Sequence, residues 1–568
     1  MERQTQRPLV FYLGLGLFQG VLLWLAGELW PEQPLARAAA SFVLFAVLVG
    51  SWQVQMLYGQ LGERRRWLGV LFCALLVGVL CAALSWQFDG ERWYRYQDDG
   101  GQWLLLGNVL VVFLLTPFLQ VAGAGRGETY PALARHAWNN GLTLLLALVL
   151  LGVFWSLIGL WVSLFKMLGV TFFRDIFLTS GFGWGASALV CSIAIRISLE
   201  RAQILDALRN VLQAMSRFML PITVLILSLF AVTLPLIGLQ PLWDTRHAGS
   251  ILLSLLFAHL CLVNGVFQDG SQASGYPKAL RGLVSASVLV LPLLGGLAAY
   301  GLWLRIDQYG LTPERVVAAL LVLLANLHAL ALCGAALRRG ELWLIALRGS
   351  NPPLALLTVG LLVLVQIGPL NPQQLSAENQ YQRLLQGEES ADPGYLKYRL
   401  GKAGQQRLER LRSELHSMPE AHRNALQEQL TALDESESWW GWKREQRRVH
   451  APLEWLNTPP ADADVLQALV QRSHYTTCQS AGCLLWSLDL GEDGHEELLV
   501  LPLGELGRRV HVFGRGPDGE WAMWGWYRTE HLHEVIQALR DGEQAQRVMP
   551  SLPTLRVGDV QLEPGPSW

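Results

Sequence analysis

Apolar residues in the first two thirds of the chain are grouped in blocks of about 20, separated by short polar segments. A helix needs about 20 apolar residues to cross the roughly 30 Å hydrocarbon core of a membrane. The pattern therefore predicts about eleven spans, near residues 9–30, 39–58, 67–86, 103–124, 142–165, 181–198, 218–240, 249–267, 283–304, 316–337 and 353–370. The aromatic stretch 166–180 predicts a further helix at the membrane surface.

The first block follows Arg3 and Arg7, as the apolar part of a signal peptide does. It is too long for a signal peptide and has no clear small-residue cleavage site, so we expect a retained span. The segment Ser198 to Phe218 is amphipathic, with cationic residues on one face. We expect it to lie along the cytoplasmic surface or to extend the sixth span inward.

The last third of the chain is polar, and its periodicity changes near residue 450. Leu and Tyr recur three and four positions apart between 371 and 450, which predicts amphipathic helices. Beyond them, the runs CLLWSLDL, EELLVLPL, RRVHVFGR and GEWAMWGWYR predict strands joined by glycine-containing turns, with two short helices and a final strand. The predicted fold class is a polytopic α-helical membrane protein with a C-terminal soluble α+β domain, divided into 1–370, 371–450 and 451–568.

Basic residues are unevenly divided between the two sets of predicted loops. The richer set has sixteen, including Arg64, Arg65 and Arg66, and the other set has eight. Because Lys and Arg accumulate in cytoplasmic loops, the N-terminus is predicted to be cytoplasmic. An odd number of spans then places the C-terminal domain in the periplasm of a Gram-negative bacterium, with the spans in its inner membrane. The net charge of −2 gives no electrostatic reason to expect nucleic acid.

Polar residues within the predicted spans are few, and no Asp, Glu or Lys lies near a span centre. Intramembrane polar groups mark transport or catalysis, or they form hydrogen bonds between helices. The candidates on which these alternatives depend are His259, Asn264, Asn326 and His328. The lack of an intramembrane carboxylate argues against an ion-coupled pump.

Several stretches resemble an uncharacterised bacterial membrane family, catalogued as domain of unknown function 4153. They are LRIDQYGLTPERV, LVNGVFQDG, SAENQYQRLL, YLKYRLGKAGQQRLERL and LPITVLILSLFAVTLPLIGLQPLW. The resemblance implies no activity, ligand or catalytic residue. Physically, Gly310, Thr312 and Pro313 in the first stretch predict a turn followed by a helix start. Arg305 and Arg315 are predicted to pair with nearby acids or lipid phosphate, or to contact a ligand.

Two features of the last third are candidates for covalent and metal chemistry. Cys478 and Cys483 are predicted to form a disulfide in an oxidising compartment, the alternatives being free thiols or a zinc pair with His474 or His495. The turn LDLGEDGHEELLVLP places Asp489, Asp493, His495 and Glu497 like the ligands of a calcium loop. Gly491 and Val500 occupy two positions where an EF-hand has oxygen ligands. The alternatives are a weak calcium site and a plain hairpin turn.

No catalytic motif is present, so enzymatic activity is not favoured. The main hypothesis is an integral inner-membrane protein of unknown biochemical activity. Its periplasmic module would sense, bind or dock a periplasmic or membrane protein partner. The first alternative is a transporter or lipid-handling protein. The second is a polyprenyl-linked sugar transferase, for which the loop with Asp89, Glu91, Asp98 and Asp99 offers carboxylates.

Overall fold

The computed structural model of the protein describes most of the chain. It covers residues 8–87, 101–122, 129–244, 248–268, 275–338, 343–388, 391–443, 452–460, 462–472, 482–490, 494–503, 509–516, 520–529, 531–541, 543, 555–557 and 560–562. The chain forms two compact units, Met1–Gln429 and Leu430–Trp568.

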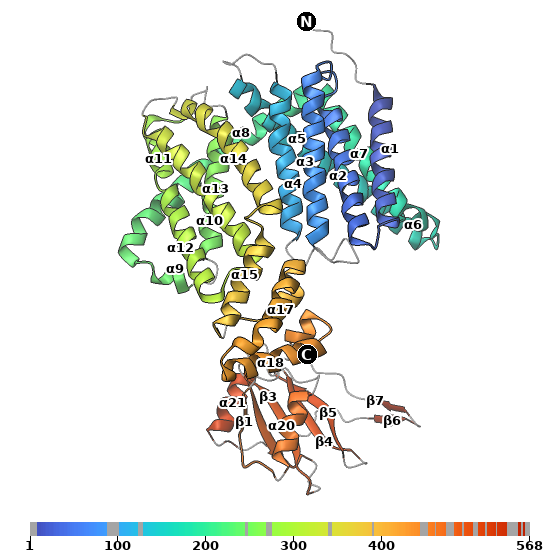
Figure 1. The fold of residues 1–568 in the computed structure, drawn as a ribbon, viewed down its shortest axis with the longest axis vertical. Helices are drawn as coiled ribbons and strands as arrows, with labels where there is room; N and C mark the ends of the chain where they lie inside the picture. The colour runs from blue at the N-terminus through green and yellow to red at the C-terminus, as the bar shows by residue number, and fades with distance from the viewer. Residues whose placement is uncertain are drawn as a thin grey trace. The chain divides into compact units, whose positions relative to one another are not determined.

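Eleven helical segments in these ranges are long and apolar enough to cross a membrane, as predicted. Figure 1 shows them in the first unit. They are α1 (Leu9–Glu28), α2 (Pro34–Met56), α3 (Arg64–Gln87), α4 (Gly101–Val121), α5 (Thr129–Met167), α7 (Ser180–Glu200), α8 (Ala202–Ile237), α10 (Ala248–Phe267), α11 and α12 together (Lys278–Val288, Leu291–Tyr309), α13 (Pro313–Ala336) and α14 (Leu347–Ile367). Short helices α6 (Phe172–Phe177), α9 (Gln240–Asp244) and η2 (Trp343–Ala346) lie between them. The expected helix within 166–180 is therefore present as α6.

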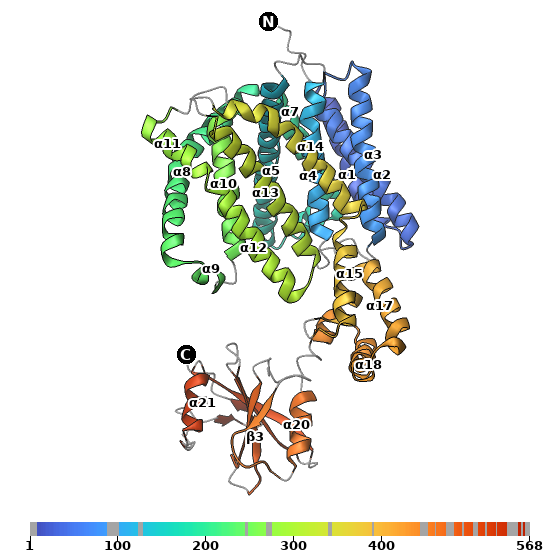
Figure 2. The same ribbon diagram turned by 60° about the vertical axis from the view of Figure 1, so that its left-hand side comes forward.

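The spans are arranged in two groups that can be followed in Figures 1 and 2. In the first group α2 packs on α3, α1 on α7, and α5 on both α4 and α7. In the second, α10 packs on α8 and α12, and α12 packs on α13. Helix α14 contacts α3 and α4 of the first group and α13 of the second, so it joins the two.

Small residues allow α1 and α7 to approach closely. A Cβ atom added at Gly20 would lie 2.6 Å from the Cα atom of Gly185, and one added at Gly16 would lie 2.6 Å from the Ser192 hydroxyl oxygen. Close backbone approach is a general means of packing helices in membranes, where lipid removes the hydrophobic driving force between them. The glycines of α1 therefore fix the position of the first span against the sixth.

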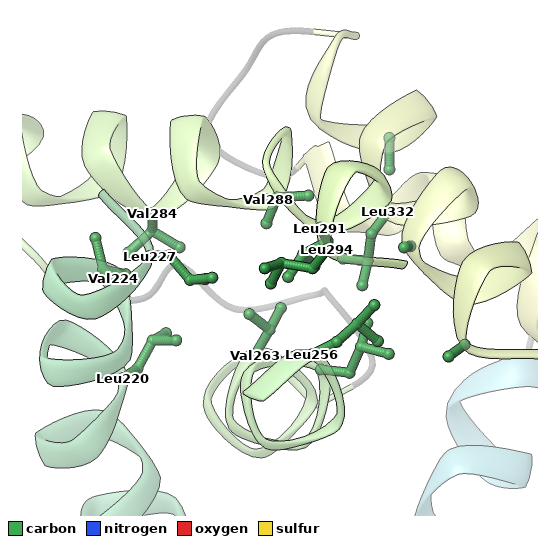
Figure 3. Close-up of a cluster of buried hydrophobic side chains, with 14 of the residues drawn as sticks. Leu220, Val224, Leu227, Leu256, Val263, Val284, Val288, Leu291, Leu294 and Leu332 are labelled. Atoms are coloured by element: carbon green, nitrogen blue, oxygen red, sulfur yellow. The ribbon is translucent and has the colours of Figure 1, made fainter. Parts of the chain in front are cut away.

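An apolar core holds the second group together. Figure 3 shows side chains from α8, α10, α11, α12 and α13 pointing toward one another, among them Leu227, Leu256, Val288, Leu291 and Leu294. All five of these are fully buried. Such interlocking gives the second group a fixed shape on which polar side chains can be positioned.

The amphipathic segment 198–218 does not extend the sixth span as one continuous helix. Helix α7 ends at Glu200, Arg201 leaves helical geometry with φ −111° and ψ 62°, and α8 then continues without interruption from Ala202 to Ile237. Residues 202–218 are thus the first half of the helix that contains the seventh span, and their expected position along the cytoplasmic surface stays a prediction. Periodicity alone does not reveal this, because the apolar stripe runs smoothly through both halves.

The helices predicted after the last span are α15 (Pro372–Leu385), α16 (Pro393–Arg399), α17 (Gly401–Glu414), η3 (Leu415–Ser417) and α18 (Glu420–Glu435). Asn371 caps α15 by accepting a hydrogen bond from the Gln374 amide at 3.1 Å. Asp392 caps α16 in the same way through the Gly394 amide at 2.8 Å. Helix α15 packs on α13, α16 and α17, which attaches these helices to the spans.

The second unit contains the predicted α+β domain. A five-stranded sheet in its described part has the order β1-β2-β3-β4-β5. The strands are β1 (Leu453–Trp455), β2 (Cys483–Leu488), β3 (Glu497–Pro502), β4 (Arg509–Arg515) and β5 (Trp521–Arg528), and only β1 and β2 pair in parallel. Helix α20 (Ala463–Arg472) covers one face and α21 (Leu532–Arg540) the other. The predicted final strand is a separate hairpin, β6 (Leu555–Val557) with β7 (Val560–Leu562).

Candidate functional site

His259 lies in the apolar core and links three helices through hydroxyl groups. Its Nδ1 atom is 3.0 Å from the Thr223 hydroxyl on α8, and its Nε2 atom is 3.2 Å from the Ser287 hydroxyl on α11. A neutral imidazole donates through one nitrogen and accepts through the other, so both nitrogens are satisfied. The ring is fully buried. This geometry is that of an interhelical hydrogen bond, the structural alternative for His259.

The other predicted intramembrane residues bond to their own helices. Asn264, Asn326 and His328 contact the carbonyls of Leu260, Val322 and Leu324, each four residues earlier, at 2.8 Å. Asn326 also fills the space beside Gly295, where an added Cβ atom would lie 2.2 Å from its amide oxygen. The hydrogen bonds of these three side chains to carbonyls thus lie within single helices, unlike those of His259.

A polar network that the sequence only hinted at crosses the first group of spans. The Gln55 side-chain amide donates to the Ser192 hydroxyl at 2.9 Å. The backbone carbonyl of Gln55 accepts from the Tyr12 hydroxyl at 3.1 Å. Gln19 donates to Ser51 at 2.8 Å. The signal in the sequence was the rarity of amide side chains in these apolar blocks.

Two of the stretches that carry the family resemblance, LRIDQYGLTPERV and SAENQYQRLL, meet where α12 ends, α13 begins and α15 passes alongside. A helix leaves its last carbonyls without partners inside the helix. At α12 the Arg383 guanidinium donates to the carbonyls of Asp307 at 3.2 Å and Gln308 at 3.1 Å. The Gln380 amide donates to the Leu311 carbonyl at 3.1 Å and lies 3.5 Å from that of Tyr309.

The turn between α12 and α13 is formed by the residues that the sequence predicted for it. Asn379 of α15 also bonds to it. Gly310 has φ +74°, and Thr312 caps α13 by accepting from the Arg315 amide, with Pro313 in the first turn. The Leu311 amide donates to the Asn379 side chain at 2.7 Å. We call the set Asn379, Gln380 and Arg383, with the turn they hold, the α15 clamp. Its sequence signal is a polar face on α15 at positions 373, 376, 380 and 383.

Arg305 and Arg315 have different environments at this junction. The Arg315 guanidinium donates to the Gly310 carbonyl and lies 5.6 Å from the centre of the Tyr309 ring. Arg305 is exposed. Arg315 thus serves the turn, while Arg305 remains accessible to an anionic group such as a lipid phosphate.

A second polar contact joins α15 to α17. The buried Tyr381 donates its hydroxyl proton to Glu414, which also accepts from Arg410 at 2.9 Å. The hydrogen bond from Tyr381, followed by that from Arg410, holds the pKa of Glu414 below its ordinary value. Burial and the bond to Glu414 raise the pKa of Tyr381. The pair therefore favours a neutral tyrosine and a charged glutamate at neutral pH.

The acidic turn in the second unit uses two of its carboxylates on its own backbone. Asp489 accepts from the Gly494 amide at 3.0 Å, and Gly494 has φ +83°. The buried Glu497 accepts from the Leu490 amide at 2.6 Å. Asp493 lies outside the described residues, and His495 is exposed. Calcium binding therefore stays a prediction, as does the plain hairpin turn.

Several of the other metal and disulfide candidates also lie outside the residues that the structure describes. Among the residues that the structure describes, no group of three or more His, Cys, Asp or Glu side chains is arranged to hold a metal ion. Cys483 is fully buried in β2, whereas Cys478 and His474 lie outside the described residues, so the disulfide stays a prediction. The loop with Asp89, Glu91, Asp98 and Asp99 lies outside them too.

Strand β5 exposes aromatic side chains at the edge of the sheet. Trp524, Trp526 and Tyr527 are 54%, 46% and 56% exposed. Among the described strands β5 pairs only with β4. The Arg509 guanidinium lies 4.4 Å from the centre of the Trp526 ring, and Arg528 at the end of β5 is exposed. We call these five residues the β5 surface.

Comparisons with known proteins match one relative over part of the chain and a family model over more than half of it. The adenosylcobinamide-GDP ribazoletransferase of Pseudomonas entomophila (strain L48) is 31% identical over 148 residues, which are 23% of this chain and 58% of the relative. The chain thus spans little more than half of that relative's length. No solved structure matches. The family model described as Domain of unknown function (DUF4153) matches residues 38–411, which include every span from α3 to α14 and the α15 clamp. The chain therefore belongs to the DUF4153 family.

Proposed function

We propose that this protein is a multi-pass inner-membrane protein that presents its C-terminal α+β domain in the periplasm, where the β5 surface docks an extended, acidic segment of a partner protein. Eleven spans with a cytoplasmic N-terminus would put the second unit on the periplasmic side. The distribution of basic residues between the loops supports this orientation. The β5 surface is the observation that carries the docking role.

The edge position of β5 supports recognition through the backbone. An edge strand offers unpaired amide and carbonyl groups, and many recognition domains bind an extended peptide by adding it to such an edge. Trp and Tyr are enriched where proteins bind one another, because they bury a large area at low entropic cost. Three such side chains on one exposed strand fit this mode of binding.

Charge favours an acidic segment as the occupant. Arg509 and Arg528 face each other across β4 and β5 at the end of the strand pair, beside Trp526. Guanidinium groups pair with carboxylates through parallel hydrogen bonds. A partner strand with acidic residues would therefore meet both the aromatic and the cationic parts of the β5 surface.

Site-specific photo-crosslinking in cells tests this function. A photoreactive phenylalanine analogue replaces Trp526, and a second chain carries it at Val465, an exposed residue of α20. We expect a discrete protein adduct at position 526 and none at 465. Changing Arg509 and Arg528 to Glu should lower the adduct yield by roughly tenfold, which corresponds to about 1.4 kcal/mol of lost binding.

The same charge reversal at Arg540 is the matched control. Arg540 is half-exposed on α21 and pairs with Glu454 at 3.5 Å, away from the β5 surface. Its change to Glu should leave the adduct intact. Equal adducts at 465 and 526, or a yield at 526 that is indifferent to Arg509 and Arg528, would contradict docking on β5.

A further inference from the structure

The face of α15 that turns inward carries polar side chains without partners. Gln373 is 3% exposed, and neither its amide nitrogen nor its amide oxygen has a hydrogen-bond partner among the described residues. Ser376 is fully buried, and its hydroxyl also has no partner there. Residues three apart on a helix lie on the same face, so the two side chains are neighbours.

The first turn of α15 is joined to the ends of two spans by a polar network. The Asn371 amide donates to the Gln87 side-chain oxygen at 3.0 Å and to the Gln366 carbonyl at 3.2 Å. Gln87 in turn donates to the Gln366 carbonyl at 3.0 Å. The Gln366 side-chain oxygen is buried and, within the described part of the chain, unpartnered. Unpaired polar atoms are therefore present on both α14 and α15, which this network joins.

A neighbouring helix covers the same end of α3. The Lys402 ammonium of α17 lies 3.9 Å from the centre of the Trp86 ring, and Trp86 precedes Gln87. Helix α17 also packs along α15. The inward face of α15 is thus enclosed by helices rather than open to bulk solvent.

Burial without partners is costly, and folded proteins ordinarily pair such groups with protein atoms or with ordered molecules. The unpartnered atoms here are both polar atoms of the Gln373 amide, the side-chain oxygen of Gln366 and the Ser376 hydroxyl, all of them neutral. Together they offer two donors on Gln373, acceptors on Gln373 and Gln366, and a hydroxyl that can do either. A neutral hydroxyl-bearing molecule satisfies this set, whereas an ion would be left without a countercharge.

We propose that the first two turns of α15 cover a binding site for an uncharged hydroxyl-bearing ligand, held by Gln373 and Ser376. Two sources share this chemistry: ordered water and the hydroxyl headgroup of a neutral lipid or glycolipid. Helix α15 begins at Pro372, shortly after the last span ends at Ile367, so a lipid headgroup at the end of that span would be near it. The site is separate from the β5 surface and does not depend on the docking function.

The direction of a stability change tests whether the site is occupied. The full chain is purified in nanodiscs of phosphatidylcholine, and Gln373→Leu, Ser376→Ala and the double variant are compared with wild type. If a ligand satisfies the polar atoms, each variant loses those bonds, and Tm falls by about 2–4 °C for each kcal/mol lost. An empty site would give the reverse, because an apolar side chain removes an unpaired buried amide. A raised or unchanged Tm in all three variants would overturn the proposal.

Addition of diacylglycerol to the nanodiscs distinguishes the two sources. A rise in Tm for wild type but not for the double variant indicates a lipid hydroxyl. No rise for wild type, together with the lowered Tm of the variants, indicates water as the resident ligand. Gln382→Leu, on the exposed face of α15, is the matched control and should leave Tm within about 1 °C, because surface changes have small effects on stability. Ser376→Ala keeps the test valid should the leucine variants fail to fold.

Discussion

Gly310 is the residue on which the α15 clamp depends most directly. Its φ of +74° is strained for any residue with a side chain, and a Cβ atom there would lie 2.6 Å from the Gln380 amide nitrogen and 2.8 Å from the Arg383 Cδ atom. Gly310→Ala should therefore destabilise the protein by about 1–3 kcal/mol. Thermal unfolding in detergent measures this.

Gly296 provides the matched substitution for that test. It lies in α12, the helix that Gly310 follows, is exposed, and has no atom within 4 Å of an added Cβ. Gly296→Ala should leave stability unchanged or raise it by about 0.5–1 kcal/mol, because alanine favours the helix. Equal losses from both changes would show that the Gly310 turn carries no special constraint.

His511 makes the second unit sensitive to acid. Burial, followed by the nearby Arg509 charge, lowers the pKa of this imidazole in the folded protein. The unfolded chain then binds more protons than the folded chain as the pH falls below the ordinary His pKa of about 6.5. The stabilising contribution is complete above that pH and is lost as the pH falls toward the folded pKa.

We therefore expect the unfolding temperature of the sheet to decrease between pH 7 and pH 5.5, and His511→Gln to reduce that decrease. Intrinsic tryptophan fluorescence reports the transition, because Trp526 is paired opposite His511 across the strands. His533→Gln on α21 is the comparison, since that side chain is exposed. The idea fails if both variants keep the full pH dependence of wild type.

At single residues, local chemistry could be predicted and distant partners could not. Gly310, Thr312 and Pro313 were expected to form a turn and helix start, and they do. Their dependence on Gln380 and Arg383 was not foreseen, because about seventy residues separate the two segments. The hydroxyl partners of His259, Thr223 and Ser287, could likewise not be predicted, because they lie on other helices.

Helix α15 stabilises the end of α12 and the turn before α13 through hydrogen bonds. Arg383→Met would leave the Asp307 and Gln308 carbonyls without their guanidinium partner. The loss should destabilise the protein by about 1–3 kcal/mol. Amide hydrogen exchange should also become faster in α15 and at the start of α13, while α1 and α7 keep their protection.

Gln382→Met is the control for this change. Gln382 precedes Arg383 but is exposed, and its amide bonds only within α15, to Glu378 at 2.8 Å. We expect exchange in this variant to match wild type. Faster exchange throughout α15 in the control would assign the effect to helix propensity rather than to the clamp.

The positions of the spans could be predicted from the sequence, whereas the points at which a helix breaks or continues could not. Blocks of about 20 apolar residues identified each span, because length and hydropathy are fixed by the bilayer. The break between the sixth span and the amphipathic segment was not predictable, since it depends on the single non-helical residue Arg201. The break between α11 and α12 likewise reflects Pro292 in the first turn of α12, in a stretch that reads as one apolar block.

On the scale of the whole molecule, the arrangement of spans in two groups joined by α14 had no signature in the sequence. Every span is apolar on several faces, so hydropathy does not say which helix packs on which. The strands of the second unit were predictable from apolar runs bounded by glycine-containing turns. Their order was not, since the parallel neighbour β1 is only three residues long.

The orientation of the chain underlies the proposed docking function, and cysteine labelling tests it most directly. In a chain with its native cysteines replaced, single cysteines are placed at Val465 on α20 and at Arg64 at the start of α3, both exposed positions. A membrane-impermeant maleimide is added to spheroplasts before and after lysis. We predict that position 465 is labelled in intact spheroplasts and that position 64 is labelled only after lysis. Labelling of position 64 in intact spheroplasts, with position 465 protected until lysis, would contradict the account.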